Sequence, residues 1–158
     1  MISTTLQGGL GNMLFQIAAS ASLAWDNDDS PVYNLDDTVA RHKKHPKEYA
    51  DTLFRKLEIY PNTRDFPEYI YHDIAYKKIP YSDPLRLYGY YQSEKYFKNN
   101  EKKIRDLFEA SPHIKNFINR KYGKLLETQT VSMHIRRGDY MALPKEHPLI
   151  KIEYYDRA

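Results

Sequence analysis

Residues 131–140 have the sequence Val131-Ser132-Met133-His134-Ile135-Arg136-Arg137-Gly138-Asp139-Tyr140. An apolar, β-branched run that leads into two arginines, a glycine and an aspartate predicts a strand that ends in a turn. Open α/β sheets bind their ligands at the carboxyl edge of such strands. Because side chains alternate between the two faces of a strand, His134 and Arg136 are expected to share a face. The segment therefore predicts an α/β fold with cationic side chains at a ligand-binding edge.

The two adjacent arginines favour an anion site. The guanidinium groups of Arg136 and Arg137 repel each other unless an anion or a carboxylate compensates them, and their forked donors match phosphate oxygens. This favours a diphosphate ligand. The alternative is an ion pair between Arg137 and Asp139, with Arg136 in solvent. The spacing of the residues is compatible with both interpretations.

The N-terminal stretch predicts a strand, a glycine loop and a helix. Residues 2–6 are β-prone, residues 7–12 contain three glycines, and a helical pattern runs from Met13 to about Trp25. Backbone amides of such a loop can approach an anion, and the helix dipole favours negative charge there. The loop matches neither the dinucleotide fingerprint nor the P-loop. It is interpreted either as an anion-binding loop or as a tight turn that allows close packing.

Composition restricts the class of protein. The chain has 158 residues, of which 41% are hydrophobic and 14% aromatic, as expected for a single globular domain. Its 24 basic and 21 acidic residues are interleaved, which argues against a nucleic-acid-binding surface. The absence of cysteine excludes disulfides, zinc-thiolate sites and thiol nucleophiles. No signal peptide or apolar run of membrane-spanning length is present, so a cytoplasmic, soluble protein is expected by default.

The remaining elements are expected from local patterns. They are a strand at 32–35, a helix over 47–57, loops and short strands over 61–84, a strand over 85–91, a short helix capped by Ser93, a helix from Asn99 or Asn100 to Ala110, and a helix from Pro112 to about Lys121 that Gly123 ends. Neither the acidic turn at 26–29 nor the pair His42 and His45 has the spacing of a metal site, so no metal is expected.

Three segments together resemble a known family. They are Gly8-Gly9-Leu10-Gly11-Asn12-Met13-Leu14-Phe15-Gln16, Gly89-Tyr90-Tyr91-Gln92-Ser93-Glu94-Lys95-Tyr96-Phe97 and His134-Ile135-Arg136-Arg137-Gly138-Asp139-Tyr140. In this order they resemble the α-1,2-fucosyltransferases of bacteria, viruses and animals. Tyr154-Tyr155 also resembles the family's continuation after the arginine loop.

The resemblance implies a GT-B-like fold. An N-terminal α/β domain is expected over residues 1–125, and the start of a Rossmann-like GDP-fucose-binding domain over residues 126–158. Family members continue well beyond this point. The chain is therefore expected to be C-terminally truncated, with only the first strand and loop of the donor domain.

The resemblance also implies a reaction. The family transfers L-fucose from GDP-fucose to the 2-hydroxyl of a galactoside, with inversion and without a metal or another cofactor. Arg136 would hold the diphosphate and stabilise the leaving GDP, beside His134, because fixed cations stabilise a departing phosphate. Arg137 and Asp139 would shape the loop. The donor-binding residues implied on the glycine segment are Gly9, Gly11, Asn12 and Gln16.

The implied partners are GDP-fucose, a galactoside-terminated glycan and a second chain that supplies the rest of the donor domain. In the family context the protein would be associated with a membrane. The alternative hypothesis is a non-catalytic glycan-binding or remnant domain that has kept the acceptor side. No residue is identified as the base that activates the acceptor hydroxyl.

Overall fold

The computed structural model describes residues 1–39, 44–73, 75–135, 138 and 151–155. Contacts between Cα atoms divide the chain into a first unit of residues 1–117 and a second unit of residues 118–158. The sheets and the buried clusters described below all lie in the first unit.

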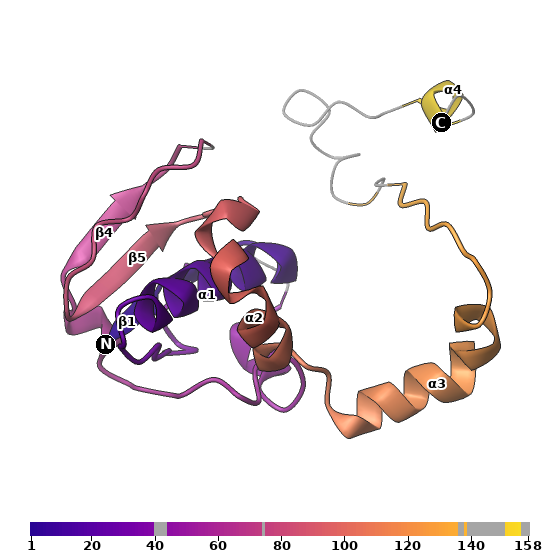
Figure 1. The fold of residues 1–158 in the computed structure, drawn as a ribbon, viewed down its shortest axis with the longest axis horizontal. Coiled ribbons are helices and arrows are strands. Elements are labelled where there is room, and N and C mark those ends of the chain that lie inside the picture. Colours follow the sequence, from indigo (N-terminus) through magenta and orange to yellow (C-terminus); the bar gives the residue numbers. More distant parts are fainter. Residues whose placement is uncertain (40–43, 74, 136–137, 139–150, 156–158) are drawn as a thin grey trace. The chain divides into compact units, whose positions relative to one another are not determined.

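A three-stranded parallel sheet forms the centre of the first unit (Figure 1). β5 (Leu85–Gly89) lies between β1 (Ile2–Thr4) and β4 (Glu68–Tyr71), and the register pairs Ile2 with Leu85 and Thr4 with Leu87. β2 (Leu6–Gln7) follows β1 and pairs in parallel with β3 (Thr38–Val39). The predicted α/β fold is confirmed. The strand expected at 32–35 is reduced to single bridges at Pro31 and Tyr33.

Helix α1 (Leu10–Trp25) packs against the sheet through small side chains (Figure 1). Ala19 and Ala24 are buried against Ile2, Leu85 and Leu87. Alanine faces allow the helix axis to approach the strands closely while still removing apolar surface from water. The helix confirms the N-terminal prediction and begins three residues earlier than expected, since it takes in the residues after Gly9.

A second buried cluster joins α1 to the segment that follows β3. Its members are Leu6, Met13, Ile17, Tyr33, Leu35, Phe54 and Leu57. The helix predicted over 47–57 is wrong: the structure has only the short 3₁₀ helix η1 (Pro46–Tyr49), followed by turns. Phe54 and Leu57 reach the core from these turns, 2% and 8% exposed. These apolar residues are therefore buried as their spacing suggested, although the segment that carries them is not a helix.

The remaining helical elements agree only in part with the local signals. They are η2 (Thr63–Asp65), η3 (Glu94–Tyr96), η4 (Lys98–Asn100), α2 (Glu101–Leu107), α3 (Pro112–Leu126) and α4 (Ile152–Tyr155). Ser93 caps η3 by accepting a hydrogen bond from the Lys95 amide, as predicted. Helix α3 continues past Gly123, contrary to prediction, because Gly123 does not adopt the left-handed conformation of a helix C-cap.

The second unit contains no strand in its described residues. The strand expected to begin at Val131 is not formed over residues 131–135, and the Val131 side chain is 95% exposed. A strand needs a paired neighbour to satisfy its backbone groups, and the described part of this unit offers none. Among the described residues, no helix has the length and apolar character needed to cross a membrane.

An ion network connects β5, β4 and the residue before β3 on the sheet face opposite Leu85 and Leu87. The Arg86 guanidinium lies 3.0 Å from the Asp37 carboxylate and 2.9 Å from that of Glu68. Asp37 is only 5% exposed, and Arg64 lies 3.4 Å from its other oxygen. A carboxylate this deeply buried depends on its cationic partners, because removing one leaves a poorly compensated charge.

Replacing Arg86 with methionine should therefore destabilise the fold. We expect a loss of about 2–4 kcal/mol in the free energy of unfolding, because the buried Asp37 carboxylate keeps the more distant Arg64 as its cationic partner and a weak hydrogen bond from the Thr5 hydroxyl. Urea denaturation at pH 7 measures the change. Arg105→Met is the matched control, since Arg105 pairs with Glu101 on an exposed helix surface and should cost less than about 1 kcal/mol. Equal losses in the two variants would contradict a structural role for the Arg86 network.

Candidate functional site

The first two of the three family segments, here called motifs (residues 8–16 and 89–97), meet at the carboxyl edge of the parallel sheet. The Gln92 side-chain amide donates a hydrogen bond to the Asn12 side-chain oxygen, at 2.7 Å, across 80 residues of sequence. Asn12 lies in the first turn of α1, directly after β2, and Gln92 lies just after β5. Parallel strands end at the same edge, which is where ligands bind in open α/β sheets.

A turn at Tyr91 directs Gln92 toward α1. Tyr91 has a φ of 50°, in the left-handed region that bulky residues rarely adopt. Its ring is 2% exposed and packs into the core cluster beside the sheet, and its hydroxyl donates to the Tyr69 carbonyl at 3.3 Å. Burial raises the pKa of the Tyr91 phenol, so the group is neutral at physiological pH. Burial of this ring offsets the backbone strain and leaves Gln92 at the exposed edge.

The three loop glycines differ in their conformation and in the space around them. Gly8 has a φ of +82°, and a Cβ there would lie 2.2 Å from the side-chain nitrogen of Asn12. Gly9 and Gly11 have no such conformation, and a Cβ at either would meet nothing within 4 Å. Only Gly8 is therefore needed by the packing of the loop. Gly9 and Gly11, both exposed, leave the backbone bare toward solvent.

The N-terminus of α1 carries no compensating negative group. Gly9 is the N-cap residue, no side chain caps the helix, and its first turn contains no acidic residue. The partial positive charge of the helix end is therefore available to an anion that approaches the bare loop. Across a small cavity of about 50 Å³ from Gly8 lie Lys44 and His45. Lys44 thus brings a positive charge to a cavity that Gly8 also lines.

Gln16 supports this loop from inside the protein. Its side-chain oxygen accepts a hydrogen bond from the backbone amide of Gln7, and its side-chain nitrogen donates one to the backbone carbonyl of Gln7, both at 3.0 Å. The side chain is 0% exposed. Gln16 therefore holds the end of β2 beneath the glycine loop, and its influence on a ligand passes through the Gln7 backbone.

The third motif is described only at its start. His134 lies in an exposed segment without regular secondary structure. Arg136, Arg137 and Asp139 lie outside the described residues, so their roles stay predictions. Among the described residues, no group of three or more histidine, aspartate or glutamate side chains is arranged to hold a metal ion.

Sequence reasoning did not select Gln92, although it lies within the second motif. Its amide becomes a candidate only through contact with Asn12, and no local pattern shows that residues 80 positions apart will meet. The reversal at Tyr91 was also missed, because the apolar and aromatic run over 85–91 predicts a continuous strand. A polar residue immediately after a strand end was the one available signal.

The glycine loop gives a direct test of these assignments. Gly8→Ala should lower the free energy of unfolding by about 1–2 kcal/mol or more, because of its left-handed backbone and the contact with Asn12. Gly11→Ala should leave stability unchanged or raise it by up to about 1 kcal/mol, since Gly11 lies in a helix with open space around it. Urea denaturation of both variants distinguishes the two cases. Equal destabilisation would show that the packing of the loop requires both glycines.

Comparison with known proteins gives two matches, both from Escherichia coli. An α-1,2-colitosyltransferase is 27% identical over 180 residues, which cover 98% of this chain and 61% of that protein. The O-antigen biosynthesis glycosyltransferase WbnK is 26% identical over 196 residues, which cover 97% of this chain and 65% of that protein. The chain thus spans less than two thirds of the length of either relative.

No family model matches the chain, and no solved structure shows a significant match to it. The two relatives align with almost the whole chain, so the alignments include all three motifs that suggested the family. They confirm the resemblance: the chain is homologous to glycosyltransferases of a fucosyltransferase-like family.

Proposed function

We propose that the chain takes part in the transfer of L-fucose from GDP-fucose to the 2-hydroxyl of a galactoside. The observation that carries the proposal is the contact between Asn12 and Gln92, which joins two of the family motifs at one edge of the sheet. The homology to glycosyltransferases supports sugar transfer as the class of reaction. The donor and the acceptor hydroxyl come from the family resemblance.

In this proposal the protein stabilises the leaving group. When the bond between fucose and the diphosphate breaks, negative charge develops on the GDP oxygens. Arg136 is proposed to neutralise it, with His134 beside it and with Arg137 and Asp139 shaping the loop. The uncapped end of α1, with the bare backbone at Gly9 and Gly11, offers a second positive region for the donor.

The acceptor hydroxyl attacks the anomeric carbon from the opposite side, so the configuration inverts in one displacement. The step is proposed to need no metal, since arginine and backbone amides supply the positive field. No residue is assigned as the base. The proposal keeps an N-terminal domain over 1–125 and a donor-domain segment over 126–158, and it assigns no residue to the guanine base.

A colitosyl donor is the second candidate, because one relative is named an α-1,2-colitosyltransferase. Colitose is L-fucose without its 3-hydroxyl, so the two sugars would use the same diphosphate contacts. The two donors would differ only in the contacts that the sugar makes with the pocket around it. Parallel transfer assays with the GDP derivatives of both sugars separate the candidates, because a site built to hydrogen-bond a hydroxyl strongly rejects the analogue that lacks it.

Calorimetric titration of GDP and GDP-fucose into the purified chain tests the proposal. We expect micromolar affinity, about −8 kcal/mol, and at least roughly tenfold weaker binding after Arg136→Ala, because a charge-assisted hydrogen bond is worth about 1.5–3 kcal/mol. Arg120→Ala is the matched control, since Arg120 is an exposed arginine of α3 outside the motif. A folded chain that binds neither compound, or equal binding by Arg136→Ala and wild type, would contradict the proposal.

A further inference from the structure

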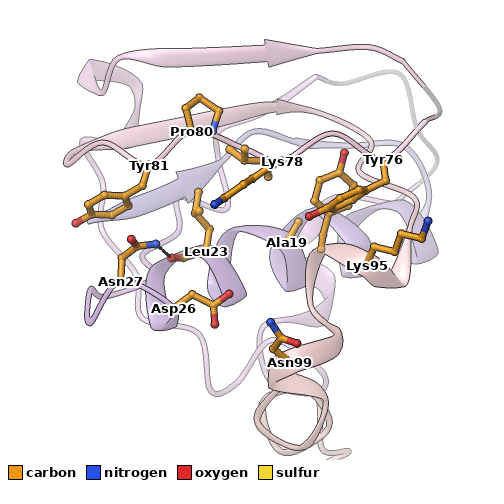
Figure 2. Close-up of a pocket in the computed structure, with 12 residues that line it drawn as sticks. Ala19, Leu23, Asp26, Asn27, Tyr76, Lys78, Pro80, Tyr81, Lys95 and Asn99 are labelled. Carbon is orange, nitrogen blue, oxygen red and sulfur yellow. Dashed lines mark hydrogen bonds between the residues drawn. The ribbon is translucent and has the colours of Figure 1, made fainter.

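A cavity of about 720 Å³ lies in the first unit (Figure 2), and neither Asn12 nor Gln92 lines it. Three parts of the chain line it: the C-terminal half of α1, the segment 76–81, and residues 95–99 after β5. None of the residues predicted from the sequence as donor-binding or catalytic belongs to this lining. The volume lies within the range of about 300–1,000 Å³ that is typical of small-ligand sites.

The floor of the cavity is apolar and two of its edges are aromatic. Ala19 and Ile79 are buried in the floor, 1% and 6% exposed. At opposite ends of the opening lie Tyr76 and Tyr81, whose exposed fractions are 45% and 43% (Figure 2). The Tyr76 ring is held against Tyr96, with ring centroids 4.9 Å apart. These tyrosines therefore offer flat apolar faces and polar hydroxyls at the rim.

Polar groups that can still form hydrogen bonds with a ligand surround this apolar floor. The side chains of Lys78 and Asn99 form no hydrogen bond within the described part of the chain, and both line the cavity. Asp26 accepts a hydrogen bond from Asn100 through one carboxylate oxygen, at 2.7 Å, and its other oxygen has no hydrogen-bond partner among the described residues. The lining thus presents an ammonium donor, an amide that both donates and accepts, and a carboxylate acceptor.

This combination suits a polyhydroxylated ligand. A sugar ring has an apolar face, which can lie on tyrosine, and hydroxyl edges that both donate and accept hydrogen bonds. A phosphate group would be repelled by the Asp26 carboxylate. The cations of the lining are lysines, which lack the forked donors of arginine that bind phosphate best. A flat protein partner would not fill a concave site of this volume.

The cavity also lies beside the proposed reaction site along the chain. Asn12 is in the first turn of α1 and Asp26 is its C-cap, so the helix spans roughly 20 Å between them at about 1.5 Å per residue. At its other end the cavity is lined by Lys95 and Tyr96, which follow Gln92 within four residues. A ligand in the cavity would thus extend from the second motif along the C-terminal half of α1.

We propose that this cavity binds sugar residues of an oligosaccharide acceptor that do not themselves react. This inference rests on the proposed function for its link to transfer, but the binding site itself is independent of the donor. A monosaccharide acceptor at the carboxyl edge would leave the cavity empty, whereas a longer acceptor would occupy both places. Affinity for the acceptor should therefore rise with its length.

Ligand-observed NMR and calorimetry with lacto-N-tetraose test the inference, with methyl β-galactoside as the short comparison. The tetrasaccharide should bind the folded chain, and Tyr76→Ala and Tyr81→Ala should each weaken its binding at least tenfold. The matched control is Tyr122→Ala, because Tyr122 is 42% exposed and lies on α3, outside the cavity. Titration of GDP-fucose into the same variants should give unchanged affinity.

The outcomes separate this inference from the proposed function. Tetrasaccharide binding that Tyr76→Ala and Tyr81→Ala leave unchanged would overturn the inference, and so would its absence in a chain that binds GDP-fucose. Tetrasaccharide binding that depends on both tyrosines, in a chain that does not bind GDP-fucose, would support the cavity as a glycan site and contradict the donor proposal.

Discussion

The parallel pairing of β1 with β5 is the constraint on which the first unit depends. It joins Ile2 to Leu85 and Thr4 to Leu87, so the chain between them must return to the same end of the sheet before β5 begins. That requirement places β4 on the far edge of β5 and α1 across one face. It also brings the carboxyl ends of β2 and β5 together, and the contact between Asn12 and Gln92 follows from that geometry.

Buried polar groups then determine the shape of this edge. Gln16 is fully buried, and such a polar side chain is tolerated only when its donors and acceptors are satisfied. The Gln7 backbone satisfies them, which ties the end of β2 to the second turn of α1. The Arg86 network acts similarly on the other side of the sheet. The glycine loop follows Gln7 directly, so the contacts of Gln16 help to preorganise its exposed backbone.

Tyrosine has two roles in this structure. Tyr33 and Tyr91 are almost fully buried and use their hydroxyls to satisfy carbonyl groups of the core. Tyr76 and Tyr81 keep nearly half of their surface exposed around a concave opening. A residue that combines an apolar ring with a polar tip can do either. The buried tyrosines thus stabilise the core, whereas the exposed tyrosines line the cavity that we propose binds glycans.

Local patterns were sufficient for the elements whose stability is local. Helix α1, strand β5 and the Ser93 cap were predictable, because helical periodicity, the alternation of apolar residues along a strand and capping residues act over a few neighbours. The same approach failed over 47–57, where turns bury Phe54 and Leu57, and at Gly123, which stays helical. The three motifs identified the family, but their mutual contacts could not be derived from them.

The sequence by itself determined the α/β class, the glycine loop and the candidate residues Asn12 and Gln16, but not Gln92. Only the tertiary structure decided which of them meet: Gln16 turned inward to Gln7, Asn12 paired with Gln92, and Tyr91 reversed the chain. The physical reason is the distance along the sequence over which each effect acts. Propensity depends on adjacent residues, whereas a contact across 80 residues depends on the packing of the whole sheet, which must offset the entropy of closing that loop.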